Sequence, residues 1–195
     1  MNEKKLKTPE KIVNSTIECI EHYGFDALTV RMIAETAKVN IAAINYHFRS
    51  KENLIQQVIQ TTLNHMIEDI EEIIYIPDKT PRDIIRNIIE YLLEGALRYP
   101  ELTKLNFYDT FIHNNFDTLA NKKINKILLM LNKQIEKQVK LSVDEISITL
   151  TRIFSTLFFE ILFPGYFTAS LGYDLQHTPQ VREVFLENII NTLPF

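Results

Sequence analysis

The sequence predicts an all-α fold of about nine helices, in which a long helix joins an N-terminal three-helix domain to a larger helical domain. Helix-start signals recur along the 195 residues, as Thr-Pro pairs at 8–9, 80–81 and 178–179 and as the capping-box sequence Ser-Val-Asp-Glu at 142–145. No long period-two alternation of apolar residues occurs. Only four glycines and seven prolines are present, which disfavours a β-rich fold with many tight turns.

The N-terminal helices follow from their start and stop signals. Thr8-Pro9 starts the first helix and Gly24 ends it, while Thr29 and Asn40 can cap the next two. A fourth helix ends before Pro77; its 25 or so residues would span roughly 37 Å at 1.5 Å each. Its start must therefore pack on the first three helices and its end on the later ones. The predicted helices are 9–23, 30–37, 41–47 and 51–75.

The C-terminal helices are delimited in the same way. Tyr99-Pro100 separates two helices, the capping box at 142–145 starts another, and Thr178-Pro179 starts the last. The segment 164–177 holds two of the four glycines and is predicted to be a loop. The predicted helices are 81–98, 100–113, 118–140, 143–163 and 179–193, which gives two domains, 1–52 and 53–195.

The charge is distributed unevenly along the chain. The net charge is −4, yet residues 1–52 are near neutral, with 8 Lys and Arg against 7 Asp and Glu. An anionic partner should therefore meet the N-terminal domain first. No apolar run is long enough to span a bilayer and no signal peptide is recognisable, while the single cysteine, Cys19, suits a reducing compartment. These features predict a cytoplasmic protein.

The segment 29–48, TVRMIAETAKVNIAAINYHF, has the pattern of a helix-turn-helix. Two short helices are separated by a break at Lys38-Val39-Asn40, and Asn40 can cap the second of them. In such a motif the second helix enters the major groove of DNA with its first residues at the base edges. The residues predicted to face the core are Val39 in the turn and Ile33, Ala37, Ile44 and Phe48 on the helices.

Three stretches together resemble the TetR/AcrR family of bacterial transcriptional regulators. They are Tyr-Gly-Phe at 23–25, Leu-Thr-Val-Arg-x-Ile-Ala at 28–34 and Asn-Tyr-His-Phe-Arg-Ser-Lys-Glu-Asn-Leu at 45–54. The resemblance covers roughly residues 8–56. It implies a homodimer that binds a palindromic double-stranded DNA operator and whose C-terminal domain binds a small molecule. It also implies that binding of this ligand releases the protein from DNA. Most members of the family are repressors.

The resemblance also implies roles for individual residues. Asparagine can bond adenine through N6 and N7, and alanine can touch a thymine methyl group. A helix N-terminus favours a phosphate through its free amides and its dipole. The positions carried over are Thr29 and Lys51 for backbone phosphates, Tyr46 and His47 at the backbone near the end of the recognition helix, Asn40, Ala42, Ala43 and Asn45 facing bases, and Arg31 and Lys38 as added phosphate or base contacts.

Each of these roles has a structural alternative. Asn45 could be a solvated helix residue, Tyr46 could pack on the first helix, and His47 could be a structural histidine. The lysines at 4, 5, 7 and 11 are either a disordered tail or an arm for the minor groove.

Two positions depart from the family pattern. Lys38 stands in the turn where the family usually has glycine, and lysine adopts a positive φ at a cost of roughly 1 kcal/mol. The residues after Asn40 are Ile-Ala-Ala-Ile instead of the more usual small-Gly-Thr-Leu type. The operator sequence therefore cannot be transferred from a relative.

The C-terminal helices suggest a ligand cavity and a dimer interface. Aromatic and methionine side chains on the helices between 51 and 163 could line an apolar cavity, with packed core as the alternative. Gly95, in mid-helix, either permits close packing or leaves space for a ligand. The helices 143–163 and 179–193 are apolar on more than one side, which favours a four-helix interface across a two-fold axis over a purely internal core; the family pairs these last two helices. The ligand candidates are Met66, Tyr91, Phe107, Tyr108, Phe111, Met130, Phe154 and Phe158, and the interface candidates are Leu157, Phe158, Ile161, Leu162, Val181, Phe185 and Ile189.

Signals for catalysis are missing from the sequence. The five histidines are scattered, and neither His-x₃-His nor Cys-x₂-Cys occurs, so no metal site is predicted. No Gly-rich phosphate loop or nucleophile–base set is found, so no cofactor and no enzyme activity are predicted. The alternatives to a DNA-binding regulator are a helical protein-interaction scaffold that has lost DNA binding, and a helical enzyme.

Overall fold

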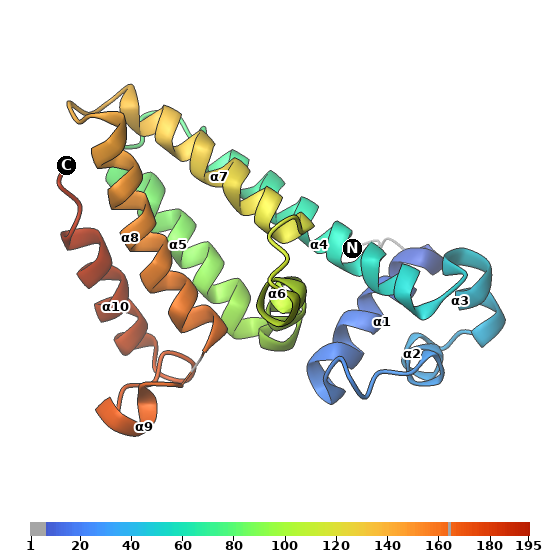
Figure 1. Cartoon of the computed structure of the whole chain (residues 1–195). Coiled ribbons are helices and arrows are strands. Elements are labelled where there is room, and N and C mark those ends of the chain that lie inside the picture. Colours follow the sequence, from blue (N-terminus) through green and yellow to red (C-terminus); the bar gives the residue numbers. More distant parts are fainter. Residues whose placement is uncertain (1–6, 164) are drawn as a thin grey trace, which may run out of the picture.

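The computed structural model describes residues 7–163 and 165–195, and every regular element within them is a helix, as predicted (Figure 1). Lys4 and Lys5 of the possible N-terminal arm lie outside these ranges. The helices α1 to α3 gather at one end of the molecule, and α4 runs from them into the larger helical domain. The elements are α1 Thr8–Tyr23, α2 Val30–Ala37, α3 Ile41–Phe48, α4 Lys51–Ile74, α5 Pro81–Arg98, α6 Pro100–His113, α7 Leu119–Glu136, α8 Val143–Leu162, α9 Thr168–Leu171 and α10 Pro179–Asn191.

Two elements differ from the prediction. α7 ends at Glu136 instead of near 140, because the N–H groups of Gln138 and Val139 both turn back to the carbonyl of Ile135. The predicted loop 164–177 contains the four-residue helix α9, so ten helices are present instead of nine. This short helix makes no side-chain cap bond, which is why no start signal marks it in the sequence.

All four predicted helix starts lie within one residue of the observed ones, but the expected side-chain cap bond forms at two of them and not at the other two. Thr80 and Ser142 each begin a capping box, in which the side chain accepts from the third helical N–H and the third residue's carboxylate accepts in return. Thr8 is the first residue of α1 and Lys7 is its N-cap, while Thr178 makes no side-chain cap bond.

The first three helices form a compact unit, here called the head, around their own hydrophobic core. The core takes side chains from α1 to α3, with Ile12, Ile33 and Ile44 almost completely buried. It also takes residues from outside the head: the first turns of α4, and Leu102 and Leu105 of α6. The half-buried Val39 packs against this core from the turn.

The C-terminal domain is built around α5. Its isoleucines at 84, 85, 88 and 89 are fully buried, and α5 contacts α4, α8 and α10. The guanidinium of Arg82 donates to the carbonyls of Ile190, Leu193 and Phe195, which ties the end of α10 to the start of α5. α5 is therefore enclosed by packing on several sides.

Three of the predicted interface residues lie inside this domain instead of on its surface. Leu157 is 0% exposed, Ile161 5% and Ile189 6%, because α5, α6 and α7 pack against α8, and α5 packs against α10. Phe158, Leu162, Val181 and Phe185 are half-buried. The apolar side chains that α8 and α10 leave exposed are Val143, Ile148, Phe159 and Val184.

The turn between α2 and α3 carries the backbone strain that the sequence suggests. Lys38 has φ 52° and ψ 47°, in the left-handed region. Its N–H and that of Val39 bond back to the carbonyls of Glu35 and Ala34 at 3.1 and 3.0 Å, which closes the end of α2. A lysine therefore occupies a conformation that glycine adopts at lower cost.

We predict that Lys38→Gly raises the free energy of unfolding by about 1 kcal/mol, because glycine lacks the Cβ that disfavours this conformation. Urea unfolding followed by circular dichroism measures the change. Lys38→Ala is the matched control, since it removes the charged side chain and keeps the strain. An equal gain in both variants would show that the backbone conformation is not the cause.

Candidate nucleic-acid interface and ligand cavity

The position of the recognition helix α3 is fixed by side-chain caps. The Oγ1 of Thr29 accepts from the N–H of Met32 at 3.2 Å and starts α2. The Oδ1 of Asn40 accepts from the N–H of Ala42 at 2.8 Å and starts α3. The Asn40 oxygen is thus used by the cap, which leaves its amide NH₂ as the group available for an outside partner.

The two faces of α3 are sharply divided. Ile44 and Phe48 are buried in the head, whereas Ala42, Asn45 and Tyr46 are exposed. Tyr46 is 82% exposed, so the alternative in which it packs on α1 is wrong.

The side chains beside this face are accessible as well. His47 is exposed, makes no side-chain hydrogen bond within the described ranges, and lies edge-on to the Tyr46 ring with centroids 5.0 Å apart. Ala43 is half-buried. The side chains on the outer side of α3 therefore remain available to bind another molecule.

Two of the predicted cations are already engaged within the head. Arg31 forms an ion pair with Glu35 at 3.2 Å on the surface of α2. The Nζ of Lys51 donates to the carbonyl of Leu28 and lies 5.6 Å from the centre of the Phe25 ring. Lys51 thus ties α4 to the loop before α2. The sequence-based prediction of Lys51 as a phosphate contact did not include this structural role.

Other positive groups remain available near α3. Lys38 is exposed and forms no ion pair among the described residues. Arg49, which the sequence analysis did not single out, is exposed in the turn after α3 with φ 67°, next to Ser50, the N-cap of α4. Arg49 could have been found in the sequence as a positively charged residue between the end of one predicted helix and the start of the next.

The N-terminus of α4 favours negative charge. Glu52 stands in its first turn, and a backbone N–H and the Ser50 hydroxyl hold the pKa of this carboxyl below its usual value. The same field from the helix end would favour a phosphate group.

A cavity of about 500 Å³ lies in the C-terminal domain between α4, α5, α6, α7 and α8. Its wall is mainly apolar, and Met66, Tyr91, Phe107 and Phe158 of the predicted ligand residues line it. A Cβ added at Gly95, which also lines it, would meet no atom within 4 Å, so this glycine leaves space and does not serve close packing.

The cavity carries a few polar groups. The Oδ1 of Asn106 is buried without a hydrogen-bond partner in the described part of the chain. The Tyr91 hydroxyl donates to Asp69 at 2.6 Å. Burial is the larger cause that raises the pKa of Tyr91, and this hydrogen bond adds to it. An apolar wall with few fixed polar groups suits a small amphipathic molecule.

The other four predicted ligand residues lie elsewhere. Tyr108 faces the head, where its ring centre is 6.3 Å from that of Phe25. Phe111 packs near Phe163, Phe154 is buried in the core, and Met130 is partly buried against that core. Aromatic content alone did not show which side of each helix faces the cavity.

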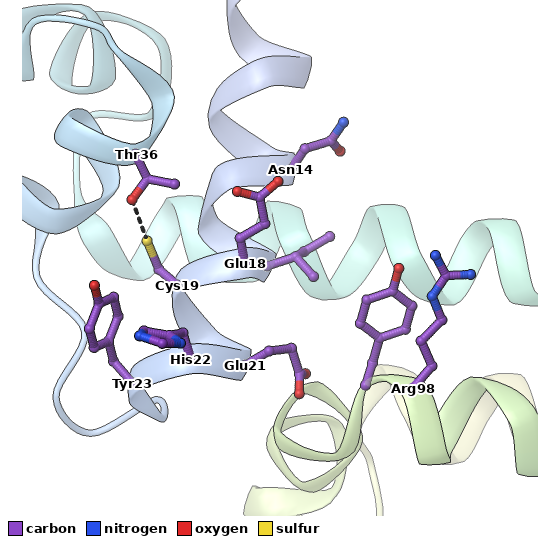
Figure 2. Close-up of a pocket in the computed structure, with 10 residues that line it drawn as sticks. Asn14, Glu18, Cys19, Glu21, His22, Tyr23, Thr36 and Arg98 are labelled. Carbon is purple, nitrogen blue, oxygen red and sulfur yellow. Dashed lines mark hydrogen bonds between the residues drawn. The ribbon is translucent and has the colours of Figure 1, made fainter.

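A second, wider hollow of about 900 Å³ separates α1 from the corner between α5 and α6 (Figure 2). It shares Ile17, Arg98 and Tyr99 with the cavity in the C-terminal domain. Cys19 closes one side, where its thiol donates to the Thr36 hydroxyl at 3.2 Å. The contact between the head and the C-terminal domain is therefore incomplete along α1.

The described residues contain no group of three or more His, Cys, Asp or Glu side chains that could hold a metal ion. In the same ranges, no helix combines the length and apolar character needed to cross a bilayer.

Comparison with known proteins places the head in a family. Residues 12–58 match the family described as bacterial regulatory proteins, tetR family. The chain is 24% identical over 194 residues to the probable HTH-type transcriptional regulator YttP of Bacillus subtilis, which covers 95% of this chain and 91% of YttP. It is 20% identical over 191 residues to IcaR of Staphylococcus aureus, an HTH-type negative transcriptional regulator of the biofilm operon icaADBC, covering 94% and 96% of the two chains.

Among solved structures, the chain is similar to the transcriptional regulator FadR from Bacillus subtilis in complex with stearoyl-CoA. The TM-score is 0.62 at 19% identity, and the likeness covers 94% of this chain and 98% of FadR, which shows a shared fold. The match over residues 12–58 places the head in the tetR family of bacterial regulatory proteins, and the curated relatives that cover most of the chain are HTH-type transcriptional regulators.

Proposed function

We propose that this protein is a homodimeric, sequence-specific DNA-binding repressor that a small apolar or amphipathic ligand releases from a palindromic operator. The observation that carries the proposal is the outer face of α3, where Ala42, Asn45 and Tyr46 are exposed on a helix whose start is fixed by a cap. The family match in the head supports it. The negative regulation by IcaR supports repression over activation.

In this proposal residues 1–52 are the DNA-reading unit and residues 53–195 bind the ligand and dimerise. Asn45 reads a base edge, and Ala42 and Ala43 contact bases or a thymine methyl group. Arg31 and Lys51 keep their predicted roles at the DNA, and each is also engaged within the head, Arg31 with Glu35 and Lys51 with the carbonyl of Leu28. The full set of proposed contacts is Thr29, Arg31, Lys38, Asn40, Ala42, Ala43, Asn45, Tyr46, His47 and Lys51, to which the exposed Arg49 is added.

Dimerisation through α8 and α10 accounts for the apolar side chains that these helices leave exposed. Ile148, Phe159 and Val184 would be covered by the second subunit, together with the half-buried Phe158, Leu162, Val181 and Phe185. A two-fold axis would place the two recognition helices about 34–36 Å apart, one turn of DNA.

The cavity in the C-terminal domain is the proposed ligand site. Met66, Tyr91, Phe107 and Phe158 line it beside the polar Asn106. FadR was solved with stearoyl-CoA, an amphipathic molecule, which supports this ligand class here. A ligand can release DNA only if it binds the released form more tightly than the DNA-bound form.

We predict tight and specific binding to a site in the DNA upstream of the protein's own coding region, measured by fluorescence anisotropy over a salt series. The logarithm of the binding constant should fall linearly with the logarithm of salt concentration, by about 0.9 for each neutralised phosphate. Affinity for the specific fragment should exceed that for random DNA by on the order of a thousandfold or more. Equal, weak binding to both the upstream fragment and fragments selected from the genome would contradict the proposal.

We predict that Asn45→Ala reduces discrimination between operator and random DNA by roughly 1–3 kcal/mol, because it removes a base contact. Tyr46→Phe removes only a hydroxyl at the backbone and should weaken both DNAs to the same extent. Asn14→Ala, an exposed asparagine on α1, is the control and should change neither. Equal losses on both DNAs for Asn45→Ala would refute its role in base reading.

We predict that Val184→Glu converts the dimer to a monomer, because a buried, unpaired charge costs about 3–5 kcal/mol. Sedimentation equilibrium measures the dissociation constant, and operator affinity should fall with it. Phe116→Glu, at an equally exposed apolar residue away from α8 and α10, is the control and should leave the dimer intact. A Val184→Glu protein that remains dimeric would exclude this interface.

A further inference from the structure

The helix α6 begins without a cap of its own. Its N-cap residue Tyr99 makes no side-chain cap bond, and the first helical residue, Pro100, has no N–H. The next two N–H groups, of Glu101 and Leu102, cannot bond within the helix because they belong to its first turn. They therefore need an acceptor from outside the helix.

Glu21 of α1 supplies that acceptor from the head. Its Oε1 accepts from the N–H of Leu102 at 2.7 Å and its Oε2 from the N–H of Glu101 at 3.2 Å. The bonds join residues about eighty positions apart, and they place a carboxylate at the positive end of α6.

The charge environment of Glu21 consists of few groups. Burial raises the pKa of Glu21, and the two backbone N–H bonds oppose that rise. Of the neighbouring charges, Glu101 raises the pKa and Lys104 lowers it, while these two also pair with each other at 2.7 Å. The carboxylate is thus partly desolvated and held by the helix start.

The two sides of α6 face different parts of the protein. Leu102 and Leu105 are buried in the core of the head. Thr103, Asn106 and Phe107 line the cavity in the C-terminal domain, as Leu102 also does. A molecule that fills the cavity would therefore contact the helix that Glu21 holds.

Beside the bonds that Glu21 accepts, α6 packs Leu102 and Leu105 into the core of the head, while a hollow remains between the outer side of α1 and the corner of α5 and α6. Figure 2 shows the Glu21 carboxylate directed at the start of α6, with Arg98 across the hollow. In the described ranges, the hydrogen bonds between α1 and α6 are those that Glu21 accepts. α1 in turn packs directly on α2 and α3.

We propose that Glu21 is the positioning residue that couples the cavity to the DNA-reading head. A displacement of α6 by cavity occupancy moves the two N–H groups, and Glu21 carries that movement into α1 and so into α3. This inference rests on the proposed release of DNA by a ligand and names the residue through which release passes. Glu21 touches neither ligand nor DNA.

The experiment uses a side chain built into the cavity, so that no ligand needs to be known. Gly95 lines the cavity and has open space where a Cβ would stand, so Gly95→Leu introduces an aliphatic group there. Affinity for an operator fragment selected from genomic DNA by the parent protein is measured for four full-length proteins. They are the parent, Gly95→Leu, Glu21→Gln and the double variant.

In the parent background Gly95→Leu should weaken operator binding at least about fivefold, the lower range of allosteric coupling. In the Glu21→Gln background the same substitution should change affinity less than about twofold, because the amide has one acceptor oxygen and no longer holds both N–H groups at the start of α6. A role limited to capping α6 would give the same fold-change in both backgrounds, and that result would overturn the proposal.

Three further variants make the result decisive. Glu18→Gln removes the same charge one turn earlier on α1, from an exposed side chain that makes no hydrogen bond or ion pair with α6 in the described part of the chain, and should leave the effect of Gly95→Leu intact. Glu21→Asp keeps the charge but shortens the reach, so it should uncouple like Glu21→Gln and replaces it if that variant does not fold. If Gly95→Leu no longer weakens operator binding in the Glu18→Gln background, the assignment to Glu21 is overturned.

Failure of the proposed function gives a different pattern. A parent protein that binds no operator would refute DNA regulation. A Gly95→Leu protein that binds the operator like the parent would refute communication between cavity and head, and with it the role of Glu21. Equal, non-zero effects in both Glu21 backgrounds, or loss of the effect in the Glu18→Gln background, would reject Glu21 while leaving the switch in place.

Discussion

The continuity of α4 constrains everything else in the molecule. Its first turns place Leu54, Ile55 and Val58 in the core of the head, and its later turns place Ile67, Ile70 and Ile74 in the core of the C-terminal domain. The helix spans 24 residues, or roughly 36 Å at 1.5 Å per residue. Both cores contain side chains of this one helix. A movement of the head relative to the C-terminal domain therefore strains one of the cores unless α4 tilts with the head. The head has a second attachment to the C-terminal domain through Leu102 and Leu105 of α6.

Much of the fold could be predicted because its signals are local. Thr29, Asn40, Thr80 and Ser142 all cap helices as their sequence context indicates, and the periodic apolar residues of the head all face its core. What failed depends on distant partners. α8 is apolar nearly all round, and only the packing of α5, α6 and α7 decides that Leu157 is internal while Phe159 is exposed.

The same limit applies to the candidate sites. The outward positions of Asn45 and Tyr46 follow from helical spacing, whereas the bond from Lys51 to the Leu28 carbonyl cannot be read from either residue alone. Glu21 looks like an ordinary surface glutamate in the sequence. The hint in the sequence lies about eighty residues further on, at Tyr99-Pro100. There α6 starts without a side chain suited to capping it.

The division of α3 into two faces also bears on how the protein can evolve. Packing depends on Ile44 and Phe48, whereas Ala42, Asn45 and Tyr46 contribute nothing to the core. Substitutions on the outer face are therefore expected to cost little stability, usually within about 0.5 kcal/mol. Under the proposed function, a lineage carrying this fold can explore new operator sequences by drift at these few positions, while its cavity and the packing between its domains stay under separate selection.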